Sequence, residues 1–161
     1  PIIMRLLEED FNVEEIIVMV QKEVAERMVA DPGGKDYGIL SIAVQYYTEG
    51  EIAFDVPPSV FIPRPRVDSA VISLKKLDQP RVDVIDEDFF FKMVKSAFHQ
   101  RRKTIRNSLS KAPFINISKK IIEQALEQVG IDSRRRAEKL EIERLAKLSN
   151  VLFELKDQDL S

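Results

Sequence analysis

The 161-residue sequence contains no cysteine and a single histidine, His99. Without cysteine the chain can form no disulfide and offers no thiolate to a metal ion, and one imidazole is too few for a zinc site. Nucleophilic catalysis by a Cys–His or Ser–His pair is equally poorly supported, and we expect no metal cofactor. Because His99 lies in a basic segment, we expect its side chain to be exposed or in contact with a phosphate.

Long apolar runs are also missing. No run approaches the roughly 18 residues that a membrane-spanning helix needs. The first residues do not combine a basic segment with an apolar one, as a secretory signal does. We therefore expect no membrane partner and a cytoplasmic location. The hydrophobic content of 44% is ordinary for a globular protein, so a buried core is expected.

Acidic side chains are absent from one long stretch. Residues 92–120, the acid-free window, contain nine basic residues and no acidic one, although the formal net charge of the whole chain is −2. Residues 1–91 carry 9 basic and 18 acidic side chains, and residues 121–161 carry 7 and 9. Since a merely solvated surface usually mixes both signs, the acid-free window indicates a surface that binds a polyanion such as nucleic acid.

Glycine is sparse and scattered. The five glycines lie at positions 33, 34, 38, 50 and 130. None belongs to the strand–glycine loop–helix arrangement that brings backbone amides to a nucleoside cofactor. The sequence therefore predicts no cofactor-binding residues in this chain.

The hydrophobic pattern predicts an α/β segment up to about residue 77. The β-branched run at residues 16–20 is typical of a strand covered on both faces in a parallel sheet. Residues 37–47 predict an apolar helix, and residues 51–56 and 69–77 predict two further strands. In the last of these, Ala70, Ile72 and Leu74 alternate with more polar positions and should share one buried face.

The remainder of the chain predicts helices. Residues 88 to about 109 predict one long helix, residues 118–128 a second that Ser118 caps and Gly130 ends, and residues 141–153 a third. Leu145, Leu148 and Leu152 should form the apolar face of the third helix. The polar, proline-containing segment between residues 78 and 88 predicts a boundary. We therefore expect a first domain at residues 1–78, a linker at 79–87 and a helical domain at 88–161.

The connection between the two later strands is stiffened by four prolines around Phe61. Each proline fixes its own φ angle and restricts the residue before it, so this loop loses little entropy when it presents a ring. Such a ring is a stacking surface for an unstacked base, whereas packing of Phe61 into the core is the plainer alternative. Arg64 and Arg66 could hold the flanking phosphates or be solvated loop charges.

On the predicted long helix, the apolar residues share one arc and basic side chains occupy an adjacent stripe about 100° wide. We expect the stripe to bind nucleic-acid phosphates in a salt-dependent manner. Arg101 departs from it and projects into the apolar arc, so we expect Arg101 to pair with a buried carboxylate. The stripe consists of Lys95, His99, Arg102, Lys103 and Arg106.

Four segments, in order, resemble one protein family. The run Phe-Ile-Pro-Arg-Pro-Arg-Val-Asp-Ser at residues 61–69, after Val-Pro-Pro, resembles the target-base loop of the ribosomal RNA adenine dimethyltransferases. Residues 97–109 are similar to a basic run of the bacterial, KsgA-type branch, and residues 21–27 and 136–138 to two other landmarks. The resemblance implies the back half of a Rossmann-like class I methyltransferase sheet, followed by a small all-helical C-terminal domain.

The resemblance also implies a function for the whole protein. We expect S-adenosylmethionine-dependent dimethylation of adenine N6 in small-subunit (16S) ribosomal RNA, with the pre-30S particle as a partner and Phe61 beside the target adenine. The family's Asn-Leu-Pro-Tyr motif and glycine-rich cofactor loop are absent from the sequence. We therefore expect a C-terminal fragment that is inactive alone and whose half sheet exposes an edge for self-association.

Two other functions stay open. A non-catalytic ribosome-assembly or rRNA-binding module would use the same helical surface. The related erythromycin-resistance methyltransferases of large-subunit RNA share the proline loop but fit residues 98–109 less well. A cofactor-binding half elsewhere in the whole protein would favour the enzyme over the binding module.

Overall fold

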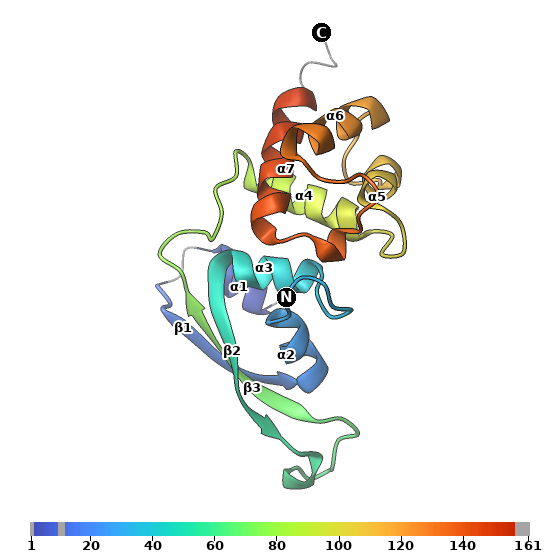
Figure 1. The fold of residues 1–161 in the computed structure, drawn as a ribbon. Helices are drawn as coiled ribbons and strands as arrows, with labels where there is room; N and C mark the ends of the chain where they lie inside the picture. Colours follow the sequence, from blue (N-terminus) through green and yellow to red (C-terminus); the bar gives the residue numbers. More distant parts are fainter. Residues whose placement is uncertain (1, 10–11, 157–161) are drawn as a thin grey trace. The chain divides into compact units, whose positions relative to one another are not determined.

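The computed structural model describes residues 2–9 and 12–156 of the chain (Figure 1). The chain divides into two compact units. The first unit consists of Pro1–Asp31 and Asp36–Arg81, and the second of Pro32–Lys35 and Val82–Ser161. The short segment at residues 32–35 thus belongs to the second unit, although its neighbours in sequence belong to the first.

The first unit combines a three-stranded sheet with helices, so the fold is mixed α/β. Both strand pairs are antiparallel, and the order β1-β3-β2 places β3 in the centre. The β2–β3 hairpin extends past α2, with its loop at the tip (Figure 1). The elements are α1 (Ile2–Glu8), β1 (Glu15–Gln21), α2 (Lys22–Met28), α3 (Ile39–Tyr47), β2 (Thr48–Val56), the 3-10 helix η1 (Pro58–Val60) and β3 (Ser69–Lys76).

The central strand β3 follows the predicted alternation. Ala70, Ile72 and Leu74 are all 0% exposed, which confirms the predicted buried face. Because β3 is hydrogen-bonded on both edges, these three side chains anchor the core of the first unit. The predicted helix at 37–47 and the predicted strand at 51–56 are also present, with β2 beginning earlier, at Thr48.

Strand β1 differs from its prediction. Among the described residues it pairs only with β3, antiparallel, with Val18 opposite Ile72. One face is covered, since Ile16 is 6% exposed, but Ile17 and Met19 on the other face are 63% and 51% exposed. The expected two-sided burial in a parallel sheet is therefore wrong for this chain. β-Branched side chains suit any pleated surface, so their run does not reveal whether a second layer covers the strand.

Gly50 lies at a close approach within the sheet. It is paired with Leu74, whose side chain is fully buried. A Cβ atom added at Gly50 would lie 2.9 Å from Leu74 Cδ2 and 3.3 Å from Val29 Cγ1. The position therefore favours glycine for reasons of space, not of backbone angle.

We expect Gly50→Ala to destabilise the first unit by about 1–3 kcal/mol, because the added methyl group overpacks a buried side chain. The measurement is the midpoint of urea denaturation. Gly38→Ala is the matched control, since a Cβ there meets nothing within 4 Å. Equal midpoints for the two variants would show that Leu74 moves aside at no cost.

The second unit is helical, with no strand among its described residues. Helix α4 packs on α5 and α7, and α6 packs on α5 and α7. None of the helices in the described part of the chain is long and apolar enough to cross a membrane. The elements are α4 (Glu87–Phe98), α5 (Ile105–Lys111), α6 (Lys119–Val129), the 3-10 helix η2 (Ala137–Lys139) and α7 (Ile142–Lys156).

Helices α6 and α7 confirm their predictions. Ser118 Oγ accepts a hydrogen bond from the Ile121 amide at 3.4 Å, and Gly130 ends α6 in the left-handed conformation with φ 71°. Leu145, Leu148 and Leu152 of α7 are all 0% exposed. The caps mark both ends of α6, and the 3.6-residue period identifies the buried face of α7.

The predicted long helix at residues 88–109 is wrong, because the chain breaks it between α4 and α5. Thr104 caps α5 by accepting a hydrogen bond from the Asn107 amide at 3.4 Å. The Ile105 amide donates to the Arg135 carbonyl oxygen at 2.7 Å, outside either helix. The hydrophobic period does not reveal this break, because Phe98 and Ile105 are seven residues apart and would share one face of a continuous helix.

Candidate nucleic-acid interface

The loop at residues 57–68 carries three of the predicted site residues. After β2 the backbone makes the tight turn of η1, in which the Phe61 amide donates to the Pro58 carbonyl oxygen at 3.3 Å. The Ile62–Pro63 peptide bond that follows is cis. Phe61 is half-buried, whereas Arg64 and Arg66 are exposed and have no ion-pair partner among the described residues. The loop thus offers two free guanidinium groups near a partly accessible ring.

Apolar side chains are exposed in the same loop. Val60 and Val67 are 62% and 47% exposed, and Ile62 is fully exposed. Several exposed apolar side chains in one loop are typical of a surface that contacts a partner. With its two arginines, the loop can contact both bases and phosphates.

Lys22 holds the base of this loop. Its Nζ atom lies 2.5 Å from Asp55 Oδ2 in β2, and its backbone amide donates to the Asp68 carbonyl oxygen at 3.0 Å. The side-chain hydrogen bond to Asp55 and the charge of that carboxylate raise the pKa of Lys22. Lys22 thereby ties the start of α2 to both ends of the loop. The sequence pattern did not single out this residue.

The second unit presents four of the five residues that were predicted to bind phosphates. Lys95 lies on α4, His99 at its C-terminal end, and Arg102 and Lys103 in the connection to α5; all four side chains are exposed. The connection is a turn in which the Lys103 amide donates to the Gln100 carbonyl oxygen at 2.8 Å. Since the long helix is broken, these residues do not form a stripe along one helix.

The same turn borders a shallow depression. Its volume is about 360 Å³, and the lining residues are Gln100, Arg101, Arg102 and Lys103. Neither Arg102 nor Lys103 has an ion-pair partner among the described residues. Two unpaired cations at an open depression form a suitable site for a phosphate group.

Arg106 differs from the other predicted phosphate ligands. It is half-buried, and its Nη1 atom lies 3.1 Å from Glu123 Oε1 of α6. Its Nε atom is buried without a hydrogen-bond partner among the described residues. Part of its charge is therefore already compensated by Glu123.

Arg101 pairs with a carboxylate, although this carboxylate is half-buried and not fully buried as predicted. Its Nη2 atom lies 3.8 Å from Glu138 Oε2, and the Glu138 side chain is only 18% exposed. Arg101 also donates a hydrogen bond to the Lys35 carbonyl oxygen. Its own side chain is 48% exposed, so the predicted projection into an apolar arc is wrong. Arg101 braces the segment at residues 32–35 within the second unit.

One aromatic ring that lies beside these basic side chains was not predicted from the sequence. Phe114, in the connection between α5 and α6, is half-buried, and Lys95 Nζ lies 4.3 Å from its ring centroid. The His99 ring packs against it nearly perpendicularly, with 5.5 Å between centroids. An aromatic residue inside the acid-free window was the available sequence signal.

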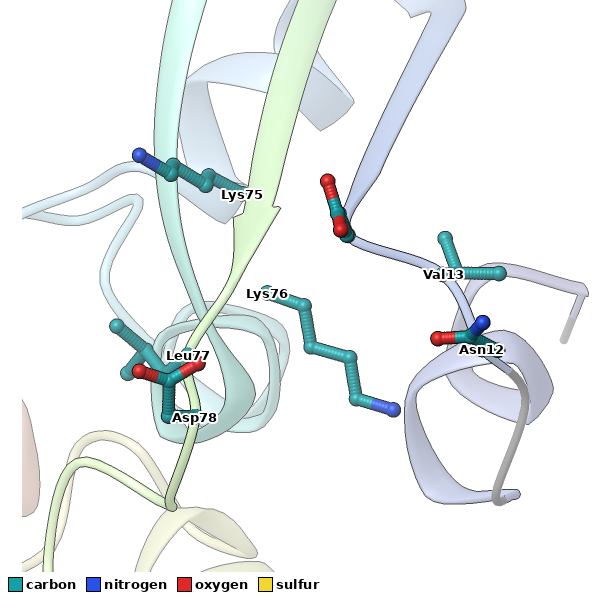
Figure 2. A pocket seen from close by; sticks show the side chains of 7 residues that line it. Asn12, Val13, Lys75, Lys76, Leu77 and Asp78 are labelled. Atoms are coloured by element: carbon teal, nitrogen blue, oxygen red, sulfur yellow. The ribbon is translucent and has the colours of Figure 1, made fainter.

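A larger depression, of about 630 Å³, lies where β1 begins and β3 ends (Figure 2). Lys76 reaches toward the segment of Asn12 and Val13, while Lys75 points to the opposite side of β3 (Figure 2). The lining also includes the carboxylates of Glu14 and Asp78, so its charge is mixed. Nor does the described part of the chain contain a cluster of His, Asp and Glu able to hold a metal ion.

The chain belongs to the family described as Ribosomal RNA adenine dimethylase, which matches residues 1–154. It is 52% identical over 160 residues to Ribosomal RNA small subunit methyltransferase A of Halothermothrix orenii, covering 99% of this chain and 53% of that protein. The protein of the same name from Clostridioides difficile is 54% identical over 152 residues, covering 94% and 52%. The chain spans about half the length of these curated relatives.

Two crystal structures share the fold. A dimethyladenosine transferase from Plasmodium falciparum superposes with a TM-score of 0.79 at 23% identity, covering 99% of this chain and 63% of that one. The 23S rRNA methyltransferase ErmE superposes with a TM-score of 0.63 at 24% identity, covering 94% and 59%. The mixed α/β fold of this chain is therefore shared with these two structures.

Proposed function

We propose that the whole protein transfers methyl groups from S-adenosylmethionine to N6 of adenines in small-subunit (16S) ribosomal RNA, producing dimethyladenine. The observation that carries this proposal is the identity of more than half of the aligned residues with proteins named as small-subunit methyltransferases. The pre-30S particle is the proposed partner, and a cytoplasmic location follows from it. We propose no role for a metal ion.

The two parts of the chain have different proposed roles. Residues 1–78 would be the C-terminal part of the catalytic domain, with their three strands the back half of a Rossmann-like class I methyltransferase sheet. Residues 79–87 would be the linker and residues 88–161 the RNA-contacting helical domain. The division of the chain into two units near residue 81 supports this assignment.

Methylation of an adenine amine depends on positioning. The amine must lose its solvent and present its lone pair to the sulfonium methyl at near-attack distance. In the proposed site Phe61 contacts the flipped adenine, and Arg64 and Arg66 hold the flanking phosphates. The contacts of Lys22 with Asp55 and Asp68 connect both ends of the loop to the start of α2 and support this role.

The proposed RNA surface of the second unit consists of Lys95, His99, Arg102 and Lys103, with Arg106 a weaker contributor. Four of the five are exposed, and the window around them contains no acidic residue. Phosphate contacts of this kind add affinity without reading sequence. Selection of the target adenine would therefore depend on other parts of the whole protein.

Among the described residues β1 pairs on one edge only, with β3, and its other edge supports a further proposal, self-association of the 161-residue chain. Antiparallel pairing of two copies about Val18 would place Ile17 opposite Met19 of the second copy, and Glu15 opposite Gln21. Ile17 and Met19 are both exposed, so this register adds apolar contacts to the hydrogen bonds of the strands.

The decisive experiment incubates the whole protein with undermethylated small subunits and methyl-labelled S-adenosylmethionine. We expect two methyl groups on each modified adenine, identified by mass spectrometry of nuclease digests of the 16S RNA. Methylation of large-subunit RNA, or none in either subunit, would contradict the proposal.

The 161-residue chain alone should neither bind S-adenosylmethionine nor transfer a methyl group, because it lacks the Asn-Leu-Pro-Tyr motif and a glycine-rich cofactor loop. Isothermal titration calorimetry with the cofactor tests this prediction, with the whole protein as the positive control. Saturable heats from the 161-residue chain would show that its own residues form a cofactor site.

A further inference from the structure

Phe114 occupies an unusual environment for an aromatic residue of the second unit. Phe90 and Phe98 of the same unit are 0% and 6% exposed and belong to its core. Phe114 is only half-buried, and its ring lies against two exposed side chains that carry or can carry positive charge, Lys95 and His99. The ring is therefore part of the cationic surface.

The charges around Phe114 favour an anionic ligand. The ring lies within the acid-free window, and Lys111, Lys119 and Lys120, which flank its loop in sequence, are all exposed. A surface that combines an accessible ring with several cations matches the requirements of single-stranded nucleic acid. Bases stack on the ring while phosphates pair with the cations.

We propose that Phe114, with Lys95 and His99, forms a stacking site for one unpaired nucleotide of a single-stranded RNA segment. The proposal rests on the proposed RNA-binding function of the second unit and adds a base-contacting site to it. Lys95 covers one side of the ring in the unbound protein. An exposed cation–π contact is weaker than base–aromatic stacking, so an incoming base can displace the ammonium group, which then pairs with the phosphate of the same nucleotide.

Stacking of this kind tolerates any base, because every base has a π-face. The site would therefore recognise that a nucleotide is unpaired, not which base it carries. In a folded ribosomal RNA such nucleotides occur in loops, bulges and ends.

The test exploits the absence of tryptophan from the chain. Phe114→Trp introduces a single tryptophan at the proposed site, in the full 161-residue chain, and its emission can be excited separately from that of the three tyrosines. The ligands are a short oligoadenylate and an abasic oligonucleotide of the same length, which keeps the phosphates and lacks the bases. We expect the oligoadenylate to quench the tryptophan fluorescence saturably and the abasic oligonucleotide to leave it nearly unchanged.

A second measurement compares affinities at fixed low salt. Phe114→Leu should weaken binding of oligoadenylate by about 5- to 20-fold and leave binding of the abasic oligonucleotide unchanged, whereas Phe114→Tyr should retain affinity. The matched control is Phe89→Leu. Phe89 is also half-buried with a lysine over its ring, Lys156 at 4.8 Å, but it lies outside the acid-free window. This control should bind both ligands like the unsubstituted chain.

The possible results distinguish the stacking site at Phe114 from the proposed RNA-binding function of the second unit. Equal affinity of the unsubstituted chain for the two oligonucleotides would overturn the stacking site and leave phosphate binding intact. If the chain binds neither oligonucleotide, both the stacking site and the proposed RNA-binding function of the second unit are overturned. An equal loss in Phe114→Leu and Phe89→Leu would also overturn the stacking site, because the effect would not be specific to the ring. If Phe114→Leu loses its helical circular dichroism, the quenching of Phe114→Trp by the two ligands decides the question.

Discussion

Phe61→Ala in the whole protein is expected to lower methyl-transfer turnover by roughly 5- to 150-fold, equivalent to about 1–3 kcal/mol of lost stacking. The loss should fall on turnover more than on RNA affinity, because phosphate contacts dominate the affinity and the ring acts on the position of the base. Single-turnover methylation and RNA binding, measured side by side, check this expectation.

Three further substitutions at Phe61 separate a stacking ring from a packing one. Phe61→Tyr and Phe61→Trp keep a π-face and should retain substantial activity, whereas Phe61→Leu keeps bulk alone and should resemble alanine. A side chain that only packs would tolerate leucine, resist tryptophan and lower the melting temperature when truncated. An active but destabilised leucine variant would therefore remove Phe61 from the proposed site.

The elements that the sequence predicts well are those whose own residues determine them. Ser118 and Gly130 mark both ends of α6, and the alternation of Ala70, Ile72 and Leu74 identifies the buried face of β3. Caps, periods and turn residues act over a few residues, so they can be recognised without knowledge of the rest of the fold.

The predictions that are wrong failed because they depend on contacts between residues that are far apart in sequence. The break before Thr104 depends on the Arg135 carbonyl oxygen, which lies about thirty residues away in sequence and accepts from the Ile105 amide. The exposure of Ile17 depends on which segments cover β1, and the restraint on Arg106 depends on Glu123 of another helix. None of these partners is visible in the local pattern.

The residues of the candidate site also fall into two groups, those that local sequence identifies and those that only the fold brings together. Phe61, Arg64 and Arg66 could be proposed from the sequence because the prolines confine them to one loop. For Phe114 the sequence shows only an aromatic residue within the acid-free window, because its contacts with Lys95 and His99 arise only when the connection between α5 and α6 folds back to α4. A ring and a cation that are far apart in sequence give no periodic signal.

Reversing the charge of Arg102 and Lys103 is expected to have the largest effect on RNA binding. Both side chains are exposed and lack an ion-pair partner among the described residues, so their full charges are available to phosphates. The double variant Arg102→Glu, Lys103→Glu should bind RNA of any sequence at least about tenfold more weakly at low salt. The slope of log affinity against log salt should become shallower by about 0.7 to 0.9 per lost contact.

The control must change the net charge equally at cations that are already paired. Lys92 lies 2.5 Å from Asp88, and Arg134 lies 3.3 Å from Asp132, in ion pairs that raise the pKa of Lys92 and lower that of Asp132. Lys92→Glu, Arg134→Glu should therefore weaken binding much less and leave the salt slope nearly unchanged. If both double variants lose affinity equally, RNA responds only to the net charge, and the turn at residues 100–103 is not a phosphate site.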